Sequence, residues 1–168
     1  MVKQDWEDIK TNKIKICYFA DADSTHTKRW VASINRSIFE IIVITYNYSK
    51  IRDIPIYTIK PPKLFSPYSP NRPFYCKFYY LFLSKKVKSI VREFDPDIIH
   101  SFWATSYGYI GSRLANKIFF VSVWGKDVST INNFSFLKRF IVKSVFKRSN
   151  YIFCTSKYLK NKVSEFTN

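Results

Sequence analysis

The chain has 168 residues, of which 46% are hydrophobic and 24% are charged, and this balance argues against a disordered protein. Its 28 lysines and arginines against 12 aspartates and glutamates give a formal net charge of +16, so the surface attracts phosphate-bearing partners, unless the lysines only reflect a compositional bias. No segment has the about 18 uncharged apolar residues of a membrane-spanning helix, and residues 1–15 lack the apolar centre of a signal peptide, so we expect a cytoplasmic or peripheral membrane protein.

Short apolar segments alternate with longer amphipathic ones after a polar N-terminal extension, residues 1–12. Strands are predicted over residues 14–20, 39–45, 54–59, 97–101, 118–123 and 151–155. Helices are predicted over residues 27–38, 74–94, 107–116, 134–147 and 157–166. Because the strands are apolar throughout, we expect them to be buried on both faces, as in a parallel sheet covered by helices. We predict an α/β fold in a single domain, residues 13–168: a Rossmann-like, doubly wound, mostly parallel sheet of about six strands with helices on both faces.

The loop after the first strand, ADADSTHTKRW, is a candidate binding loop because such sheets bind ligands beyond the carboxyl ends of their strands. It lacks a glycine-rich GxGxxG motif, so a dinucleotide-binding loop is not expected. Its carboxylates, hydroxyls and imidazole suit hydrogen bonds to sugar hydroxyls, and His26 is a candidate for proton transfer. The other candidate binding residues of this loop are Asp21, Asp23, Ser24, Thr25 and Thr27. An alternative is that Ser24 or Thr25 caps the following helix.

Two further loops carry polar residues at the same expected edge. Thr105, Ser106 and Tyr107 follow the fourth strand and are placed for contact with a substrate. His100 lies inside that strand, where it is either a ligand contact or a hydrogen-bonded core histidine.

After the fifth strand come Trp124, Gly125 and Asp127. A glycine here lets the backbone approach a ligand closely, and Asp127 is either a catalytic proton acceptor or the cap of the next turn. With two histidines and three widely spaced cysteines, we expect no metal site.

Taken together, these loops resemble the N-terminal, acceptor-side domain of family-4 glycosyltransferases with the GT-B fold. The resemblance runs from Lys13 to Phe166 and rests on the segments FADADSTHTKRWV, PDIIHSFWATSYGYIG, SVWGKDV and YIFCTSKYL. It implies transfer of a sugar from a nucleotide donor with retention of configuration, without a bound metal, often for cell-surface polysaccharide or glycolipid. Some members have a histidine where this chain has Trp124 and Gly125, which leaves Asp127 as the nearest polar candidate.

The resemblance also implies a second domain of similar size that holds the nucleotide-sugar donor with a pair of glutamates. No Glu-x7-Glu pair occurs in these 168 residues, so we expect this domain to bind no cofactor and to transfer nothing alone. Its expected partners are a sugar or lipid-linked acceptor and a C-terminal donor-binding domain or partner chain.

Two predicted helices carry stripes of basic residues. The residues expected to face an anionic membrane are Lys77, Lys85, Lys88 and Arg92 on the first and Arg139, Lys143 and Lys147 on the second. A solvated face is the simpler alternative for these lysines. Two other functions stay open: a non-catalytic membrane subunit that recruits acceptor, and a basic nucleic-acid-binding domain, for which no recognised motif is present.

Overall fold

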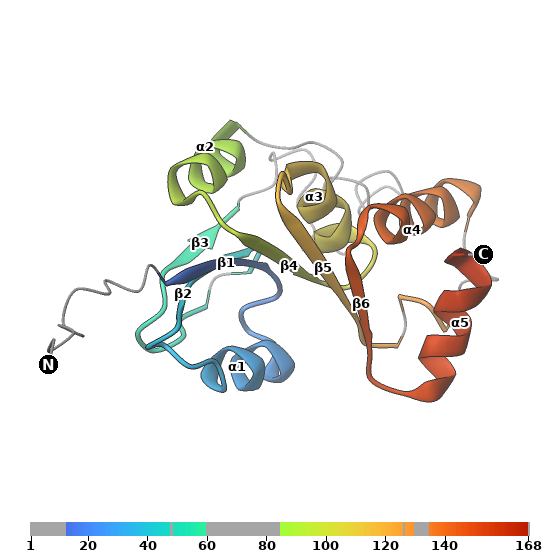
Figure 1. Ribbon diagram of the computed structural model, residues 1–168, viewed down its shortest axis with the longest axis horizontal. Helices are drawn as coiled ribbons and strands as arrows, with labels where there is room; N and C mark the ends of the chain where they lie inside the picture. Colours follow the sequence, from blue (N-terminus) through green and yellow to red (C-terminus); the bar gives the residue numbers. More distant parts are fainter. Residues whose placement is uncertain (1–12, 48, 60–84, 126, 130–134, 168) are drawn as a thin grey trace, which may run out of the picture.

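The computed structural model describes residues 13–47, 49–59, 85–125, 127–129 and 135–167, which contain six strands and five helices (Figure 1). The strands are β1 (Ile14–Phe19), β2 (Phe39–Thr45), β3 (Ile56–Thr58), β4 (Ile98–Phe102), β5 (Ile118–Val123) and β6 (Tyr151–Cys154). The helices are α1 (Thr25–Ala32), α2 (Lys85–Phe94), α3 (Ser106–Leu114), α4 (Phe136–Arg148) and α5 (Lys157–Thr167).

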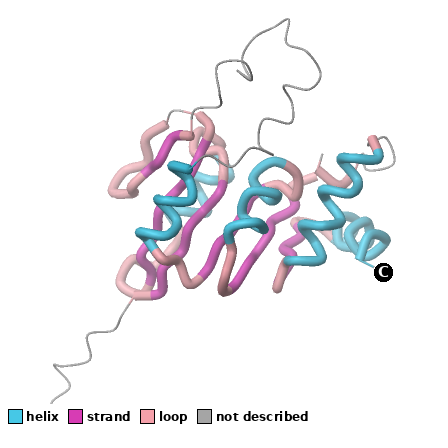
Figure 2. Tube along the Cα trace, turned by 90° about the horizontal axis from the view of Figure 1, so that it is seen from above, coloured by secondary structure: helices cyan, strands magenta, loops and turns pink. Residues whose placement is uncertain are grey.

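The six strands form one parallel sheet in the order β3-β2-β1-β4-β5-β6. Helix α1 covers one face, and α2, α3 and α4 lie side by side on the other (Figures 1 and 2). The order reverses between β1 and β4, which defines the point where ligands bind in doubly wound sheets. The predicted fold class is therefore confirmed.

Strand β1 shows why the sheet has a core on each side. Cys17 and Phe19 pack in the core formed with α2 to α5, whereas Ile16 and Tyr18 pack in the core formed with α1. Side chains of a strand alternate between the two faces, so a strand that is apolar at every position is buried on both.

One predicted helix is longer than the helix in the structure. Helix α1 ends at Ala32 instead of residue 38, because the Asn35 carboxamide accepts hydrogen bonds from the amide (3.0 Å) and hydroxyl (2.7 Å) of Ser37 in an Asx turn. Of the helix predicted over residues 74–94, only α2 lies within the described residues.

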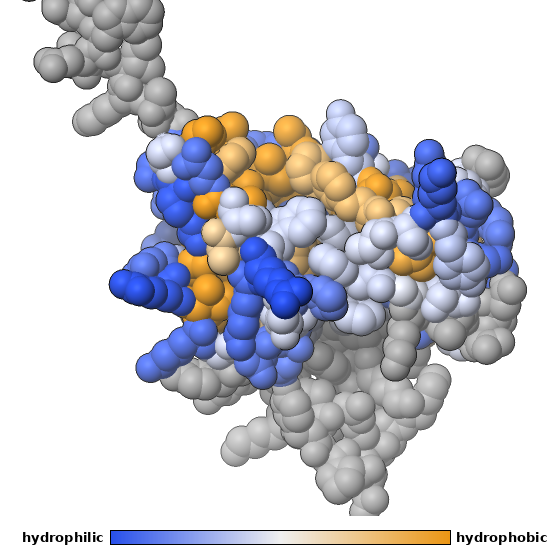
Figure 3. All heavy atoms as spheres, turned by 90° about the horizontal axis from the view of Figure 1, so that it is seen from below, coloured by the Kyte–Doolittle hydropathy of each residue, from blue (hydrophilic) through white to orange (hydrophobic). Residues whose placement is uncertain are grey.

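The sheet face beside α1 is only partly covered by the described residues. Figure 3 shows hydrophobic residues gathered in a band on the side of the molecule seen from below. On β5 and β6, Ile118 is 41% exposed, Tyr151 63% and Phe153 41%. These side chains belong to the two strands at the end of the sheet opposite β3.

Candidate functional site

Three loops meet at the carboxyl edge of the sheet. Phe19 at the end of β1 is in register with Ser101 of β4, and Phe102 is in register with Ser122 of β5. Because these strands are parallel neighbours, the β1–α1, β4–α3 and β5–α4 loops leave the sheet at one edge, next to the strand reversal.

The β1–α1 loop is held by its own polar groups. The Asp21 carboxylate accepts a hydrogen bond from the Asp23 amide at 3.0 Å, and Asp23 forms an ion pair with Lys28 at 2.8 Å. The hydrogen bond from Lys28 lowers the pKa of the exposed Asp23 carboxyl. Ser24 occupies the N-cap position of α1, as the capping alternative predicted, but its side chain makes no capping hydrogen bond. The Ser24 hydroxyl therefore makes no hydrogen bond to the backbone amides at the start of α1.

His26 is exposed and its ring stacks on Trp124, with ring centroids 4.8 Å apart and an interplanar angle of 29°. This contact joins the first turn of α1 to the β5–α4 loop. Trp30, one helical turn after His26, meets Trp124 edge-on at 6.3 Å. Trp30 was not among the residues predicted to bind a ligand, although the i, i+4 spacing from His26 places both rings on one face of α1.

Asp127 joins the β5–α4 loop to the β4–α3 loop. One carboxylate oxygen accepts hydrogen bonds from the amides of Gly125 (2.9 Å) and Trp124 (3.2 Å), and the other from the amide of Ala104 (3.1 Å). The residue is 2% exposed, and burial raises the pKa of its carboxyl, against the opposing effect of these backbone hydrogen bonds. Both oxygens accept hydrogen bonds from backbone amides that precede Asp127 in the chain, so this carboxylate links the β5–α4 loop to the β4–α3 loop.

The β4–α3 loop holds Trp103 in a conformation that is rare for a bulky residue. Its φ is 77°, a left-handed value that costs on the order of 1–3 kcal/mol. The Trp103 amide donates to the Ser122 carbonyl at 3.0 Å, and its carbonyl accepts from the Gly108 amide at 2.9 Å. A Cβ atom on Gly108 would come within 2.6 Å of that carbonyl oxygen, so glycine is required there. Trp103 was not predicted from the sequence, because no local sequence pattern indicates a left-handed backbone conformation at this residue.

His100 lies in the core and not at the surface of the site. It is 3% exposed, and its Nε2 is 2.8 Å from the Ser122 hydroxyl. Its ring is surrounded by aromatic rings with centroids within 5.8 Å, those of Tyr18, Trp30, Phe102, Phe120 and Phe153. Burial lowers the pKa of His100 to about 3, so the ring is neutral at physiological pH. The structure therefore gives it the core position that was the alternative to a ligand contact.

Two other candidate residues are also buried. Thr27 is 1% exposed on the inner side of α1, and Tyr107 is 6% exposed. The Tyr107 hydroxyl accepts a hydrogen bond from the Tyr46 amide at 3.2 Å, which ties α3 to the end of β2. These side chains are packed in the interior next to the loops and expose little surface to a ligand.

The remaining candidates lie at the surface or are half-buried: Asp21, Asp23, Ser24, Thr25, His26, Thr105, Ser106, Trp124 and Gly125. The indole N–H of Trp124 is shielded from solvent, and no acceptor for it is found among the described residues. A shielded donor without a partner costs about 1–3 kcal/mol.

The described basic residues expected to face a membrane belong to helices α2 and α4 and not to the three loops. Six of them are exposed: Lys85, Lys88 and Arg92 on α2, and Arg139, Lys143 and Lys147 on α4. Lys77 lies outside the described residues. No helix within the described ranges is both long and apolar enough to cross a membrane, and the same ranges hold no cluster of three potential metal ligands.

Comparison with known proteins identifies a family for this chain. A family model described as glycosyl transferase 4-like matches residues 15–156. A glycosyltransferase of Methanocaldococcus jannaschii, itself uncharacterized, is 33% identical over 90 residues, which are 51% of this chain and 25% of that protein.

Two solved structures have the same fold as this chain. Sucrose-phosphate synthase of Thermosynechococcus elongatus has a TM-score of 0.64 at 8% identity, over 91% of this chain and 45% of that one. A UDP-N-acetylglucosamine 2-epimerase has a TM-score of 0.65 at 11% identity, over 93% of this chain and 46% of that one. The chain thus spans a quarter of the matched relative and less than half of each structure. Since the family model extends from β1 to just past β6, the chain belongs to the glycosyl transferase 4-like family.

Proposed function

We propose that this chain is the acceptor-binding half of a retaining, nucleotide-sugar-dependent glycosyltransferase for cell-surface polysaccharide or glycolipid. Family membership supports sugar transfer as the class of reaction. We infer the binding site from the exposed His26 ring, which is stacked on Trp124 at the carboxyl edge of the sheet. A C-terminal domain or partner chain binds the nucleotide-sugar donor, so this chain binds no cofactor and transfers nothing alone.

The site suits a sugar because it combines an aromatic surface with hydroxyl and carboxylate groups. Asp21 and Ser24 lie in the loop before α1, and Thr25 precedes His26 in its first turn; all three can form hydrogen bonds with hydroxyl groups. In this proposal His26 is the residue that takes or orients the proton of the acceptor hydroxyl. Its exposed position leaves it accessible to a ligand.

Asp127 acts indirectly in this proposal, as a positioning residue. Its carboxylate binds the amides of Ala104, Trp124 and Gly125 and so holds two of the three loops together. The position of Trp124, and through it that of the His26 ring, depends on these hydrogen bonds. A direct catalytic role is not part of the proposal, because both oxygens are already hydrogen-bonded within the protein.

We further propose that the protein works at the inner face of a membrane as a peripheral protein. The exposed basic residues of α2 and α4 support this, since both helices lie on the same side of the sheet. An acceptor anchored in the bilayer would then be within reach of the soluble domain.

Binding of acceptor saccharides tests the site in this chain directly. Titration with a panel of free and lipid-linked saccharides, followed by NMR, should shift signals of the His26 and Trp124 loops for at least one member. His26→Ala should raise the Kd of that saccharide about fivefold, which corresponds to about 1 kcal/mol. Glu93→Gln, an exposed change on α2, should leave it unchanged. Equal Kd values for both variants would remove His26 from the site.

Reconstitution tests the reaction. The chain should release no nucleotide from a nucleotide sugar when alone, and should support transfer when the donor-binding domain of its own protein or gene neighbour is added. Nucleotide release by the isolated chain would contradict the proposal that a second domain binds the donor. If the reconstituted pair stays inactive, the enzyme function is rejected in favour of a subunit that recruits the acceptor.

A further inference from the structure

Helix α4 carries a stripe of aromatic and basic side chains on the side away from the core. Phe136 is 87% exposed and Phe140 is 61% exposed, both unusually high values for phenylalanine. The cations Arg139, Lys143 and Lys147 occur on the same exposed side. The opposite side of the helix supplies the buried residues Ile141, Val142, Val145 and Phe146.

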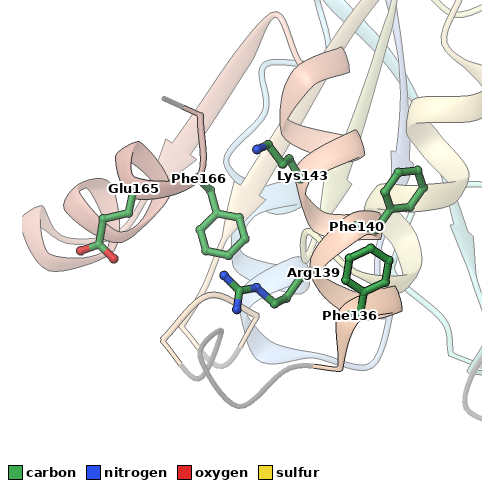
Figure 4. Close-up of a pocket in the computed structure, with 6 residues that line it drawn as sticks. All are labelled: Phe136, Arg139, Phe140, Lys143, Glu165 and Phe166. Atoms are coloured by element: carbon green, nitrogen blue, oxygen red, sulfur yellow. The ribbon is translucent and has the colours of Figure 1, made fainter.

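The first turns of this stripe form one wall of a groove between α4 and α5. The groove has a volume of about 450 Å³ and is lined by Phe136, Arg139, Phe140, Lys143, Glu165 and Phe166 (Figure 4). The Arg139 guanidinium lies 5.8 Å from the centre of the Phe166 ring, a cation–π distance. Both helices therefore contribute aromatic surface to the groove.

The charge of this groove is positive. Glu165 is paired with Lys162 at 2.9 Å, so its negative charge is already balanced outside the lining. Among the described residues, neither Arg139 nor Lys143 forms an ion pair. The groove thus offers two cations without ion-pair partners among the described residues, next to two exposed phenylalanines.

We propose that this groove anchors the protein on an anionic lipid bilayer, while the basic face of α2 contributes only electrostatic attraction. Phe136 and Phe140 insert between the lipids, while Arg139 and Lys143 bind the headgroup phosphates. Helix α2 has exposed lysines but none of the large exposed hydrophobic side chains of the described residues. Charge alone attracts a protein to an anionic surface, whereas charge combined with exposed aromatic rings also anchors it. A nucleic-acid partner would use the charge but leave the insertion of Phe136 without a role.

The place of the groove in the fold connects it to the candidate site. Because α4 follows β5, the turn with Phe136 starts from the carboxyl edge of the sheet, where the β5–α4 loop carries Trp124. Docking at this end of α4 brings that edge of the sheet toward the bilayer, which suits an acceptor carried on a lipid. In this respect the inference rests on the proposed function, but the docking itself does not.

Vesicle co-sedimentation of the 168-residue chain tests the charged part of the groove. Binding should be strong to phosphatidylcholine vesicles containing phosphatidylglycerol, weak to phosphatidylcholine alone, and reduced by salt. R139Q/K143Q should lower the partition coefficient about 30-fold, since each cation near such a surface accounts for about a fivefold change. K85Q/K88Q on α2 removes the same charge and should have a clearly smaller effect. Equal losses in the two double variants would overturn the proposal in favour of diffuse electrostatic attraction.

The aromatic part needs its own variants. F136S/F140S keeps the net charge and should lower binding at least about tenfold, whereas Tyr158→Ser, which removes an exposed aromatic of α5 outside the lining, should not. All substituted side chains are exposed, and circular dichroism checks that each variant is folded. Unchanged binding by F136S/F140S, or preference of the chain for RNA over anionic vesicles, would reject docking by insertion. Loss of vesicle binding with an unchanged Kd for a soluble saccharide separates this groove from the acceptor site.

Discussion

The buried imidazole of His100 should make the stability of this protein depend on pH in a predictable direction. Burial lowers the pKa of His100 from 6.5 to about 3, so between these pH values the unfolded chain binds a proton that the folded chain refuses. The stabilising contribution of the neutral ring is fully present above pH 6.5. It is lost as pH falls from 6.5 toward about 3.

The expected size follows from the linkage between proton binding and folding. Each pH unit below 6.5 costs about 1.4 kcal/mol, so moving from about pH 7.5 to about pH 5 should lower the free energy of unfolding by about 2 kcal/mol. For a chain of this size, that corresponds to a fall in Tm of roughly 4–8 °C. Only one other histidine, the exposed His26, is present in the sequence.

Urea unfolding followed by circular dichroism at several pH values measures this dependence. His100→Gln has no titrating ring and an amide that can still bond the Ser122 hydroxyl, so it should lose most of the slope between pH 7.5 and pH 5 whatever its stability at neutral pH. His26→Gln is the matched control and should retain the slope of the natural chain. If His100→Gln and the natural chain show the same slope, the ring is not the neutral core group that this structure describes.

Three further changes test the packing around the site. Asp127→Asn should lower the free energy of unfolding by about 2 kcal/mol, because an amide nitrogen then faces a buried backbone donor. Urea unfolding at neutral pH measures the change, and an unchanged free energy of unfolding would contradict the structural role of Asp127. Gly111→Ala should cost about 1–3 kcal/mol in the same assay, because the new Cβ collides with the Ser101 hydroxyl. Ser101→Ala should be neutral or stabilising, since that buried hydroxyl has no partner among the described residues, and the double variant S101A/G111A should recover part of the loss. Full destabilisation in the double variant would show that Phe119 or Ile99, and not the hydroxyl, is the obstacle.

Much of the fold could be predicted from the sequence because the strands are apolar at every position. Double-sided burial requires helices on both faces, and β1 satisfies that requirement with Cys17 and Phe19 in one core and Ile16 and Tyr18 in the other. Because the polar candidate residues follow the carboxyl ends of parallel strands, the sequence also predicted that they lie at one edge of the sheet. Helix ends were predicted less well, since the Asx turn at Asn35 overrides the apolar spacing that continues to residue 38.

The sequence by itself determined the fold class, the family and the edge of the sheet where the candidate loops meet. Only the tertiary structure decided which polar side chains reach that edge and which hold it together from inside. The sequence left open whether His100 and Asp127 contact a ligand. In the structure each is enclosed by groups from distant strands and loops. Local spacing cannot reveal such enclosure, because burial depends on neighbours that only folding brings near. The same reason explains why the stacking of His26 on Trp124 became visible only when β1 and β5 were placed at one edge.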